Sequence, residues 1–280
     1  MKVFETAEAL RAFRKNLRKG HATTGFVPTM GALHAGHLSL VDIAGKDADH
    51  VIVSIFVNPT QFNDPNDLKN YPRNIKRDLE LLSSHKVDAV FIPDIHEVYP
   101  SPDTRQFDFG RLEKVLEGRH RPGHFNGVAQ VVSRLFDITK PDLAFFGQKD
   151  YQQLLIVRKL TGMLDMNIRI VSCPIIRESD GLAMSSRNQL LTPEERLHAP
   201  LIFKTLLETR EMARQNPLEK VRAAAIEKLN NDPLISVEYL EVVNAENLDK
   251  ISDRNDANRI IACVAVKIGK VRLIDNLIFD

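Results

Sequence analysis

The chain has few cysteines and no long apolar run, and each absence excludes a class of protein. Only Cys173 and Cys263 occur among 280 residues, too few for a disulfide framework and not spaced as a zinc knuckle. The longest apolar stretch, Val51–Val57, is far shorter than the roughly 20 residues that a membrane-spanning helix needs. The N-terminus lacks the apolar segment of a secretory signal. We therefore expect a protein of a bacterial-type cytoplasm without a membrane partner.

No block of one charge stands out either. The chain has 38 Lys and Arg against 37 Asp and Glu, a formal net charge of +1, and no long basic run. Domains that bind nucleic acid usually show a basic face or tail, so we expect no nucleic-acid partner. The content of 43% hydrophobic and 27% charged residues is that of an ordinary globular protein. The length fits one large domain or two domains of roughly 100–180 residues.

Apolar runs and amphipathic segments alternate through the first 175 residues. Continuous apolar runs are typical of strands that are buried on both faces. Five such runs occur, at Gly25–Thr29, His50–Val57, Ala89–Ile92, Leu143–Gly147 and Asn167–Ile176. Segments with apolar residues at helical spacing separate them. The alternation predicts an α/β fold, a Rossmann-like doubly wound parallel sheet over residues 1–175.

The pattern changes after Asn188. Thr192 is a suitable N-cap, followed by Pro at the first helical position and Glu195 three residues after the cap, which predicts the start of a helix. A second helix is expected over Glu219–Leu229. Three strands should follow, at Ser236–Val243, Arg259–Val266 and Val271–Asp275. Helices followed by strands predict a smaller α+β C-terminal domain, residues 176–280.

The segment after the first predicted strand, TMGALHAGH, is the most informative one. The strand should end near Thr29, and a helix should begin around Ala35 or Gly36. Backbone N–H groups and the positive end of the helix dipole meet at such a helix start, which suits a phosphate. His34 and His37 lie three residues apart, on one side of the first turn, and can donate hydrogen bonds to phosphate oxygens.

Two other interpretations of the histidine pair are a purely structural role and a zinc site. Zinc is disfavoured because no HExxH pattern follows and no nearby acid completes a ligand set. Neither GxxxxGK[ST] nor GxGxxG occurs, which excludes the usual P-loop and dinucleotide sites. A phosphate site built on HxGH is the interpretation that remains.

Polar residues follow two further strands at the same edge of the sheet, where open α/β sheets bind ligands. Asn58 and Gln61 follow the second strand and suit hydroxyls and a carboxylate, although such residues often only stabilise a loop. Gly147 permits close approach of a ligand, Lys149 can neutralise a phosphate, and Asp150 can accept from ribose hydroxyls. A surface ion pair is the alternative for Lys149 and Asp150.

Three more candidates are basic or acidic residues outside these strands. Ser185, Ser186 and Arg187 form a small polar loop, and Arg can bind phosphate with two parallel hydrogen bonds. Arg121 stands between two histidines in HRPGH, either as a phosphate or carboxylate contact or as part of a structural turn. Asp78 lies on a helix after YPR, and a magnesium role is suggested only by its residue type.

These segments resemble those of a known family. PTMGALHAGH, FVNPTQF, YPR, RPGHFNGV, FFGQKDYQQ and DGLAMSSRN occur in family order. The chain resembles, over essentially its whole length, the pantothenate synthetases, or pantoate–β-alanine ligases, of the HxGH adenylyl-forming superfamily. The resemblance implies an ATP-dependent condensation of (R)-pantoate with β-alanine through a pantoyl-adenylate. The reaction would release AMP and pyrophosphate and belong to pantothenate and coenzyme A biosynthesis.

The resemblance also implies residue roles. The catalytic residues would be His37, His34, Lys149 and Arg187. ATP would contact Met30, His34, His37, Gly147, Lys149, Asp150, Ile176, Met184, Ser185, Ser186 and Arg187, with the Ile176 backbone at adenine. Pantoate would contact Gln61, Gln153 and Asn58, and we add Arg121 as a substrate contact. Some relatives have two adjacent acids near Mg²⁺, whereas this chain has Arg77-Asp78, which leaves Asp78 as the candidate metal ligand.

The expected partners are pantoate, β-alanine, ATP and Mg²⁺, and the resemblance implies a homodimer. A strand edge near His50–Val57 or a loop near Arg105–Leu116 would form the dimer contact, and the C-terminal domain would be a lid that excludes water. A carboxylate needs no general base at pH 7, so the reaction asks for alignment and charge neutralisation. A nucleotidylyltransferase, a tRNA-charging enzyme and a nucleotide sensor without turnover are the alternatives.

Overall fold

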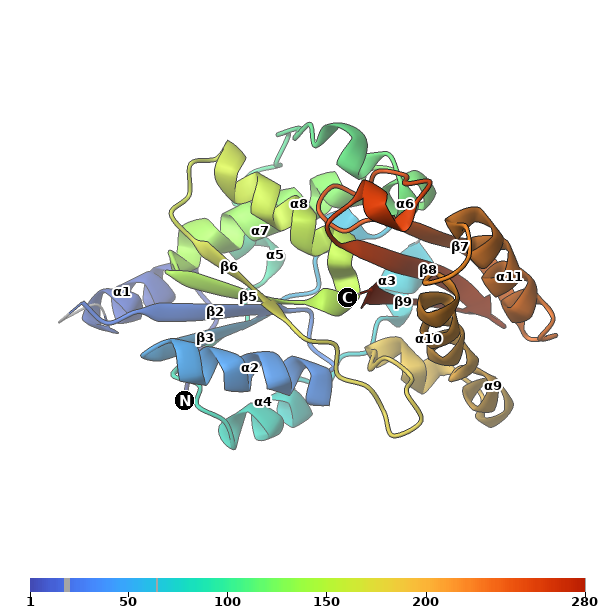
Figure 1. The fold of residues 1–280 in the computed structure, drawn as a ribbon. Helices are drawn as coiled ribbons and strands as arrows, with labels where there is room; N and C mark the ends of the chain where they lie inside the picture. Colours follow the sequence, from blue (N-terminus) through green and yellow to red (C-terminus); the bar gives the residue numbers. More distant parts are fainter. Residues whose placement is uncertain (18–20, 64, 280) are drawn as a thin grey trace. The chain divides into compact units, whose positions relative to one another are not determined.

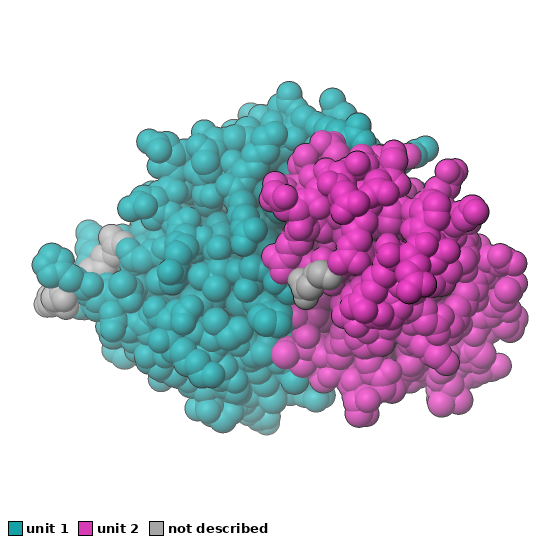
Figure 2. All heavy atoms as spheres, viewed as in Figure 1, with its two compact units in different colours: residues 1–148, 153–174 teal, residues 149–152, 175–280 magenta. Residues whose placement is uncertain are grey.

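The computed structural model describes residues 1–17, 21–63 and 65–279, and the chain divides into two compact units (Figure 2). The first unit comprises Met1–Gln148 and Gln153–Pro174, and the second comprises Lys149–Gln152 and Ile175–Asp280. The second unit resumes at Ile175, and the boundary predicted from the sequence, between residues 175 and 176, lies one residue later. Assignment of Lys149–Gln152 to the second unit is not a feature that the sequence pattern predicts.

A six-stranded parallel sheet forms the centre of the first unit (Figure 1). Its strand order is β1-β4-β3-β2-β5-β6. The strands are β1 (Lys2–Phe4), β2 (Thr24–Thr29), β3 (His50–Ile55), β4 (Ala89–Phe91), β5 (Leu143–Gly147) and β6 (Arg169–Cys173). This confirms the predicted α/β fold. The sequence pattern misses β1, which has three residues and depends on pairing with β4.

Helices cover both faces of this sheet: α2 and α4 lie on one face, and α7 and α8 on the other (Figure 1). This explains why the central strands are apolar without alternation. The helices of this part are α1 (Ala7–Leu17), α2 (Ala35–Asp47), α3 (Pro65–Asn70), α4 (Ile75–Ser83), α5 (Ile95–Val98), α6 (Leu116–His120), α7 (His124–Thr139) and α8 (Tyr151–Met163). Short 3₁₀ turns are η1 (Pro59–Gln61), η2 (Gly110–Glu113) and η3 (Gln148–Asp150).

The strand order indicates where the sheet of the first unit is expected to bind a ligand. From β2 the sheet continues through β3 and β4 on one side, and through β5 and β6 on the other. The connections after β2 and β5 therefore diverge, and open α/β sheets bind ligands at this switch point, beyond the carboxyl ends of the strands. The segments that follow β2, β3 and β5 carry half of the predicted site residues.

The expected dimer contact along the edge of the second predicted strand is wrong. That strand is β3, which pairs with β2 on one side and β4 on the other. Its backbone groups are used inside the sheet, so it has no edge to offer to a second subunit.

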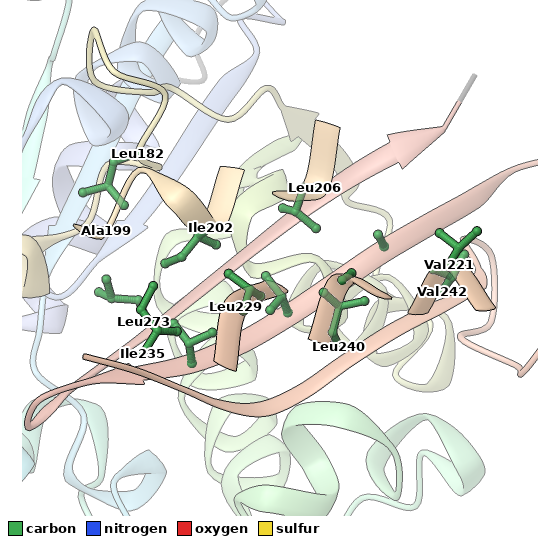
Figure 3. Close-up of a cluster of buried hydrophobic side chains, with 14 of the residues drawn as sticks. Leu182, Ala199, Ile202, Leu206, Val221, Leu229, Ile235, Leu240, Val242 and Leu273 are labelled. Atoms are coloured by element: carbon green, nitrogen blue, oxygen red, sulfur yellow. The ribbon is translucent and has the colours of Figure 1, made fainter. Parts of the chain in front are cut away.

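The second unit contains an antiparallel sheet of β7 (Ile235–Asn244), β8 (Ile260–Ile268) and β9 (Val271–Phe279). Its helices are α9 (Pro193–His198), α10 (Leu201–Met212) and α11 (Leu218–Asn230), with the 3₁₀ turns η4 (Ser186–Leu190) and η5 (Arg254–Asp256). Apolar side chains from α10, α11 and the strands meet in one core, among them Ile202, Leu229 and Leu240 (Figure 3). This confirms the smaller α+β part.

The predicted helix start at Thr192 is confirmed in its details. The Thr192 hydroxyl accepts from the Glu195 N–H at 3.2 Å, and the Glu195 carboxylate accepts from the Thr192 N–H at 2.8 Å. The capping box therefore satisfies two N–H groups that the helix itself cannot. In the described part of the chain, none of the helices combines the length and the apolar character required to cross a membrane.

Asp103 lies in the segment between α5 and η2, and its ionisation makes the folding stability of the protein decrease at low pH. The Asp103 side chain is only 2% exposed. Its carboxylate accepts hydrogen bonds from Arg105 Nε at 2.8 Å and from Arg134 Nε at 3.0 Å. The Arg105 hydrogen bonds, aided by Arg134, lower the pKa of Asp103 from 3.8 to about 2. A depressed pKa stabilises the fold above the unfolded-state value, and this stability is lost as the pH falls through the folded-state value.

We expect Asp103→Asn to lower the free energy of unfolding at pH 7 by about 2 kcal/mol, the linkage value of such a shift. The difference in the free energy of unfolding between wild type and variant should decrease by about half from pH 5 to pH 3. Urea denaturation at the two pH values measures it. A difference of equal size at both would show that Asp103 does not titrate as described.

Candidate active site

The loop between β2 and α2 has an unusual backbone. Gly31 has φ +80° and Ala32 has φ +50°, two consecutive residues in the left-handed region. Glycine adopts this conformation without steric cost, whereas for alanine it is strained. Surrounding contacts must therefore hold Ala32 in it. Helix α2 then begins at Ala35, where the sequence predicts it.

Asp78 on α4 supplies those contacts. Its Oδ2 accepts from the Ala32 N–H at 3.0 Å and its Oδ1 from the Leu33 N–H at 2.8 Å. The residue is 1% exposed. Both carboxylate oxygens thus serve the backbone of the loop. The role as a magnesium ligand stays a prediction, and these contacts indicate that Asp78 fixes the loop that leads to the two histidines.

A pocket of about 390 Å³ lies against the same loop, within the first unit. Met30, Gly31 and Asp78 form part of its wall, together with apolar residues such as Ile55 and Ile92. This part of the loop therefore borders open space on one side, and Ile55 and Asp78 pack against Gly31. The two hydrogen bonds from Asp78 are correspondingly important for its position.

The two histidines lie together at the start of α2, as their spacing predicts. His34 is the N-cap, and its Nδ1 accepts from the Gly36 N–H at 3.1 Å. A neutral imidazole that accepts at Nδ1 carries its hydrogen on Nε2, so Nε2 of His34 is a donor. The ring centroids of His34 and His37 are 4.1 Å apart, with the planes tilted by 38°. Two imidazoles and a helix N-terminus thus converge on one place that suits a phosphate.

Asn58, after β3, holds the side chain of Gln61. Asn58 Oδ1 accepts from the Thr60 N–H at 3.4 Å, and Asn58 Nδ2 donates to the Gly127 carbonyl at 3.2 Å. A backbone N–H only donates and a carbonyl only accepts, so these two groups fix which end of the Asn58 amide is which. Asn58 Nδ2 also donates to Gln61 Oε1 at 3.1 Å. The donor end of the Gln61 amide, Nε2, is therefore directed elsewhere, and it donates to the Met30 sulfur at 3.3 Å.

The backbone of Gln61 is held as firmly as its side chain. His124 Nδ1 lies 2.8 Å from the Gln61 carbonyl, so this nitrogen carries the hydrogen and donates. Arg121 donates to the same carbonyl at 3.4 Å and lies 3.6 Å from the Glu117 carboxylate. A Cβ on Gly127 would come within 2.4 Å of the Thr60 carbonyl, so only glycine allows α7 to approach η1 this closely. The HRPGHFNG segment therefore positions Gln61.

Gly147 and Gln153 flank the start of α8. Gly147 is the last residue of β5, and a Cβ there would meet no atom within 4 Å. Packing within the chain does not demand glycine at this position, which leaves room for a ligand to approach. Gln153 lies in the first turn of α8 and is half-buried.

In the second unit, the predicted nucleotide contacts come from two segments. Lys149 Nζ lies 4.0 Å from the Asp150 carboxylate, and the Lys149 side chain is 19% exposed. In the other segment, the Met184 N–H donates to the Ile176 carbonyl at 3.0 Å. Ser185 is the N-cap of η4, and its hydroxyl accepts from the Arg187 N–H at 3.3 Å. Ser186 is buried, and Met184 and Arg187 are half-buried.

Strand β9 anchors both of these segments. Arg177 donates to the two carboxylate oxygens of Asp275 at 2.6 and 3.0 Å, and its guanidinium lies 3.7 Å from the centre of the Phe203 ring. Burial raises the pKa of Asp275, and Arg177 opposes that rise. The neighbouring Asn276 amide donates to the Lys149 carbonyl at 2.9 Å. These anchors were not predicted from the sequence, although an Asp-Asn pair within an apolar strand is a signal.

Comparisons with known proteins decide the family. The model of the pantoate–β-alanine ligase family matches residues 2–278. The pantothenate synthetase of Porphyromonas gingivalis is 48% identical over 280 residues, which is all of both chains. The chain belongs to the pantoate–β-alanine ligase family.

Solved structures of the pantoate–β-alanine ligase family agree. A crystal structure of pantothenate synthetase from Thermus thermophilus has a TM-score of 0.92 and 43% identity, and 99% of each chain is covered. A crystal structure of the ligase from Francisella tularensis, complexed with beta-gamma ATP and β-alanine, has a TM-score of 0.81 and 38% identity. That match covers 99% of this chain and 97% of the Francisella one. Sequence and fold therefore place the whole chain in one family.

Proposed function

We propose that the chain is an ATP-dependent ligase that condenses pantoate with β-alanine to pantothenate, with a pantoyl-adenylate as the intermediate. The family and the match to a relative solved with beta-gamma ATP and β-alanine support this reaction. We further propose that it works in the cytoplasm as a homodimer, as the family resemblance implies.

One observation carries the proposal at the level of the site. The rings of His34 and His37 lie against each other at the N-terminus of α2, next to the switch point of the sheet, with Nε2 of His34 as a donor. A polyphosphate bound there would receive hydrogen bonds from imidazoles and the positive end of a helix dipole. The adjacent Gln61 amide offers an N–H to an oxygen of the acid.

The proposed chemistry has two steps. A carboxylate oxygen of pantoate attacks the α-phosphorus of ATP, and the bond to pyrophosphate breaks. The uncharged amine of β-alanine then attacks the acyl carbon, loses a proton, and displaces AMP, which keeps the attacking carboxylate oxygen. No protein side chain becomes covalently attached, so His34 and His37 act by stabilising the charge of the phosphates.

Residues of the second unit would complete ATP binding. We propose that Lys149 and Arg187 contact phosphate oxygens with Ser185 and Ser186, and that Asp150 contacts the ribose. Met184 and the backbone at Ile176 would contact the nucleotide, as the resemblance implies. The anchoring of these segments on β9 supports the proposal, because a rigid binding residue loses less conformational freedom when the ligand binds.

We propose that magnesium binds to the protein together with ATP. Residues 1–17, 21–63 and 65–279 contain no group of three His, Cys, Asp or Glu side chains that could hold a metal ion. Asp78 is committed to the loop backbone. A magnesium ion would thus be held mainly by phosphate oxygens and water, as is common for this ion. It would neutralise phosphate charge there, and we assign no protein ligand to it.

A single assay separates this function from its alternatives. With pantoate, ATP and β-alanine, the ligase should release AMP only when all three are present. A nucleotidylyltransferase would leave the nucleotide on its acceptor and release no AMP. A tRNA-charging enzyme would need tRNA, and a sensor would bind ATP without turnover. Absence of pantoate-dependent AMP release from folded protein would refute the proposed function.

Gln61→Ala should raise the KM for pantoate by about 10- to 100-fold, because an oxygen of the bound acid would lose its hydrogen-bond partner. The KM for ATP should stay within a factor of two. Initial rates at varied pantoate and varied ATP measure both constants. If the KM for ATP rose and that for pantoate did not, Gln61 would belong to the nucleotide site.

A further inference from the structure

We propose that Tyr99 is a positioning residue for the acid substrate: its hydroxyl helps to hold Asn58 in place, and Asn58 orients the Gln61 amide so that its N–H end faces pantoate. The inference rests on the proposed function, and neither the family motifs nor the sequence analysis includes Tyr99. The residue follows α5 as its C-cap and is 9% exposed.

The Tyr99 hydroxyl donates to Asn58 Oδ1 at 2.9 Å. This contact is shorter than the two that Thr60 makes with the same oxygen, 3.1 Å from its hydroxyl and 3.4 Å from its N–H. Burial raises the pKa of Tyr99, so the hydroxyl keeps its proton and remains a donor at neutral pH. Tyr99 therefore supplies the closest of the hydrogen bonds that hold the oxygen end of Asn58.

The side-chain amide of Asn58 links Tyr99 to Gln61. With Oδ1 held by Tyr99 and Thr60, Asn58 Nδ2 donates to Gln61 Oε1 at 3.1 Å, which leaves Nε2 as the donor end of the Gln61 amide. Nε2 donates one of its two hydrogens to the sulfur of Met30 at 3.3 Å, on the loop that leads to the histidines, so the second hydrogen is the one for pantoate. A reversed Gln61 amide would present a carbonyl, which repels a carboxylate. Asn58, held by Tyr99 together with Thr60 and Gly127, thus keeps the donor end of Gln61 available for an oxygen-rich acid.

Tyr99→Phe removes one hydroxyl oxygen and little else. We expect the KM for pantoate to rise by about 5- to 10-fold, the effect of one net hydrogen bond. The kcat and the KM values for ATP and β-alanine should stay within a factor of two. Tyr239→Phe, a matched loss of a tyrosine hydroxyl from β7 in the other unit, should leave all four constants unchanged.

A double-mutant cycle distinguishes positioning from a general effect on the fold. If Tyr99 acts through Gln61, then Tyr99→Phe in a Gln61→Ala background should cause no further rise in the KM for pantoate. A general loss of stability would instead multiply the two effects and would also lower the melting temperature in proportion. Melting curves of all four proteins accompany the kinetics.

The outcomes separate this inference from the function on which it rests. An unchanged KM for pantoate in Tyr99→Phe, with a raised one in Gln61→Ala, would overturn the role of Tyr99 and leave the proposed function intact. Multiplied effects in the cycle would overturn it as well. Absence of pantoate-dependent activity in the wild-type protein would refute the function itself.

Discussion

His37→Ala should reduce the pantoate-dependent exchange of pyrophosphate into ATP by about 10²–10³-fold, the scale for losing one preorganised donor to a developing charge. Exchange reports only the first step, in which the carboxylate attacks the α-phosphorus. His37 lies in the first turn of α2, with its ring 4.1 Å from that of His34. Its removal leaves His34 and the helix N-terminus in place, so a residual rate should remain.

The control for this variant is His96→Ala. His96 is an exposed histidine on α5, so its loss changes the histidine content without touching the proposed phosphate site. It should exchange pyrophosphate at the wild-type rate. An exchange rate within threefold of wild type in folded His37→Ala would show that His37 does not stabilise the transferring phosphate.

Asp78→Ala should lower both stability and activity. The Ala32 and Leu33 N–H groups would lose a buried, charged acceptor, and each such hydrogen bond contributes about 1.5–3 kcal/mol. The apolar pocket residues next to Met30 and Gly31, such as Ile55 and Ile92, have no side-chain acceptor that could replace the lost contacts. We expect the free energy of unfolding to fall by about 3 kcal/mol or more. Exchange should fall at least tenfold, because the loop sets the position of His34.

Magnesium concentration separates the two roles of Asp78. If Asp78 holds the loop, raising Mg²⁺ should not restore exchange, whereas a lost metal ligand should be rescued by it. Glu80→Gln removes an exposed acid from the same helix and should behave as wild type. Rescue of Asp78→Ala by Mg²⁺, with unchanged stability, would restore the metal role that the residue type suggests.

Local sequence was enough to predict the elements that carry the histidines. The apolar run of β2, the short loop and the helix start at Ala35 lie within a dozen residues, so propensity and capping decide them. The same holds for α9, which Thr192 and Glu195 begin by bonding to each other. Strand–helix alternation then predicted the parallel sheet correctly.

Contacts between distant segments could not be predicted in this way. Asp78 lies 46 positions from Ala32, and Tyr99 lies 41 positions from Asn58. Nothing in the local pattern distinguishes such a carboxylate or hydroxyl from a solvent-facing one. The interior position of β3 is likewise a property of the whole sheet, which is why the expected strand-edge contact failed.

The most direct test of the acyl-adenylate traces the carboxylate oxygens of pantoate into the products. Pantoate labelled with ¹⁸O in both carboxylate oxygens is incubated with ATP, β-alanine and the protein, and the products are weighed by mass spectrometry. The account predicts one ¹⁸O in the phosphate of AMP and one in the new amide of pantothenate. Unlabelled AMP, or label in inorganic phosphate formed together with ADP, would contradict it.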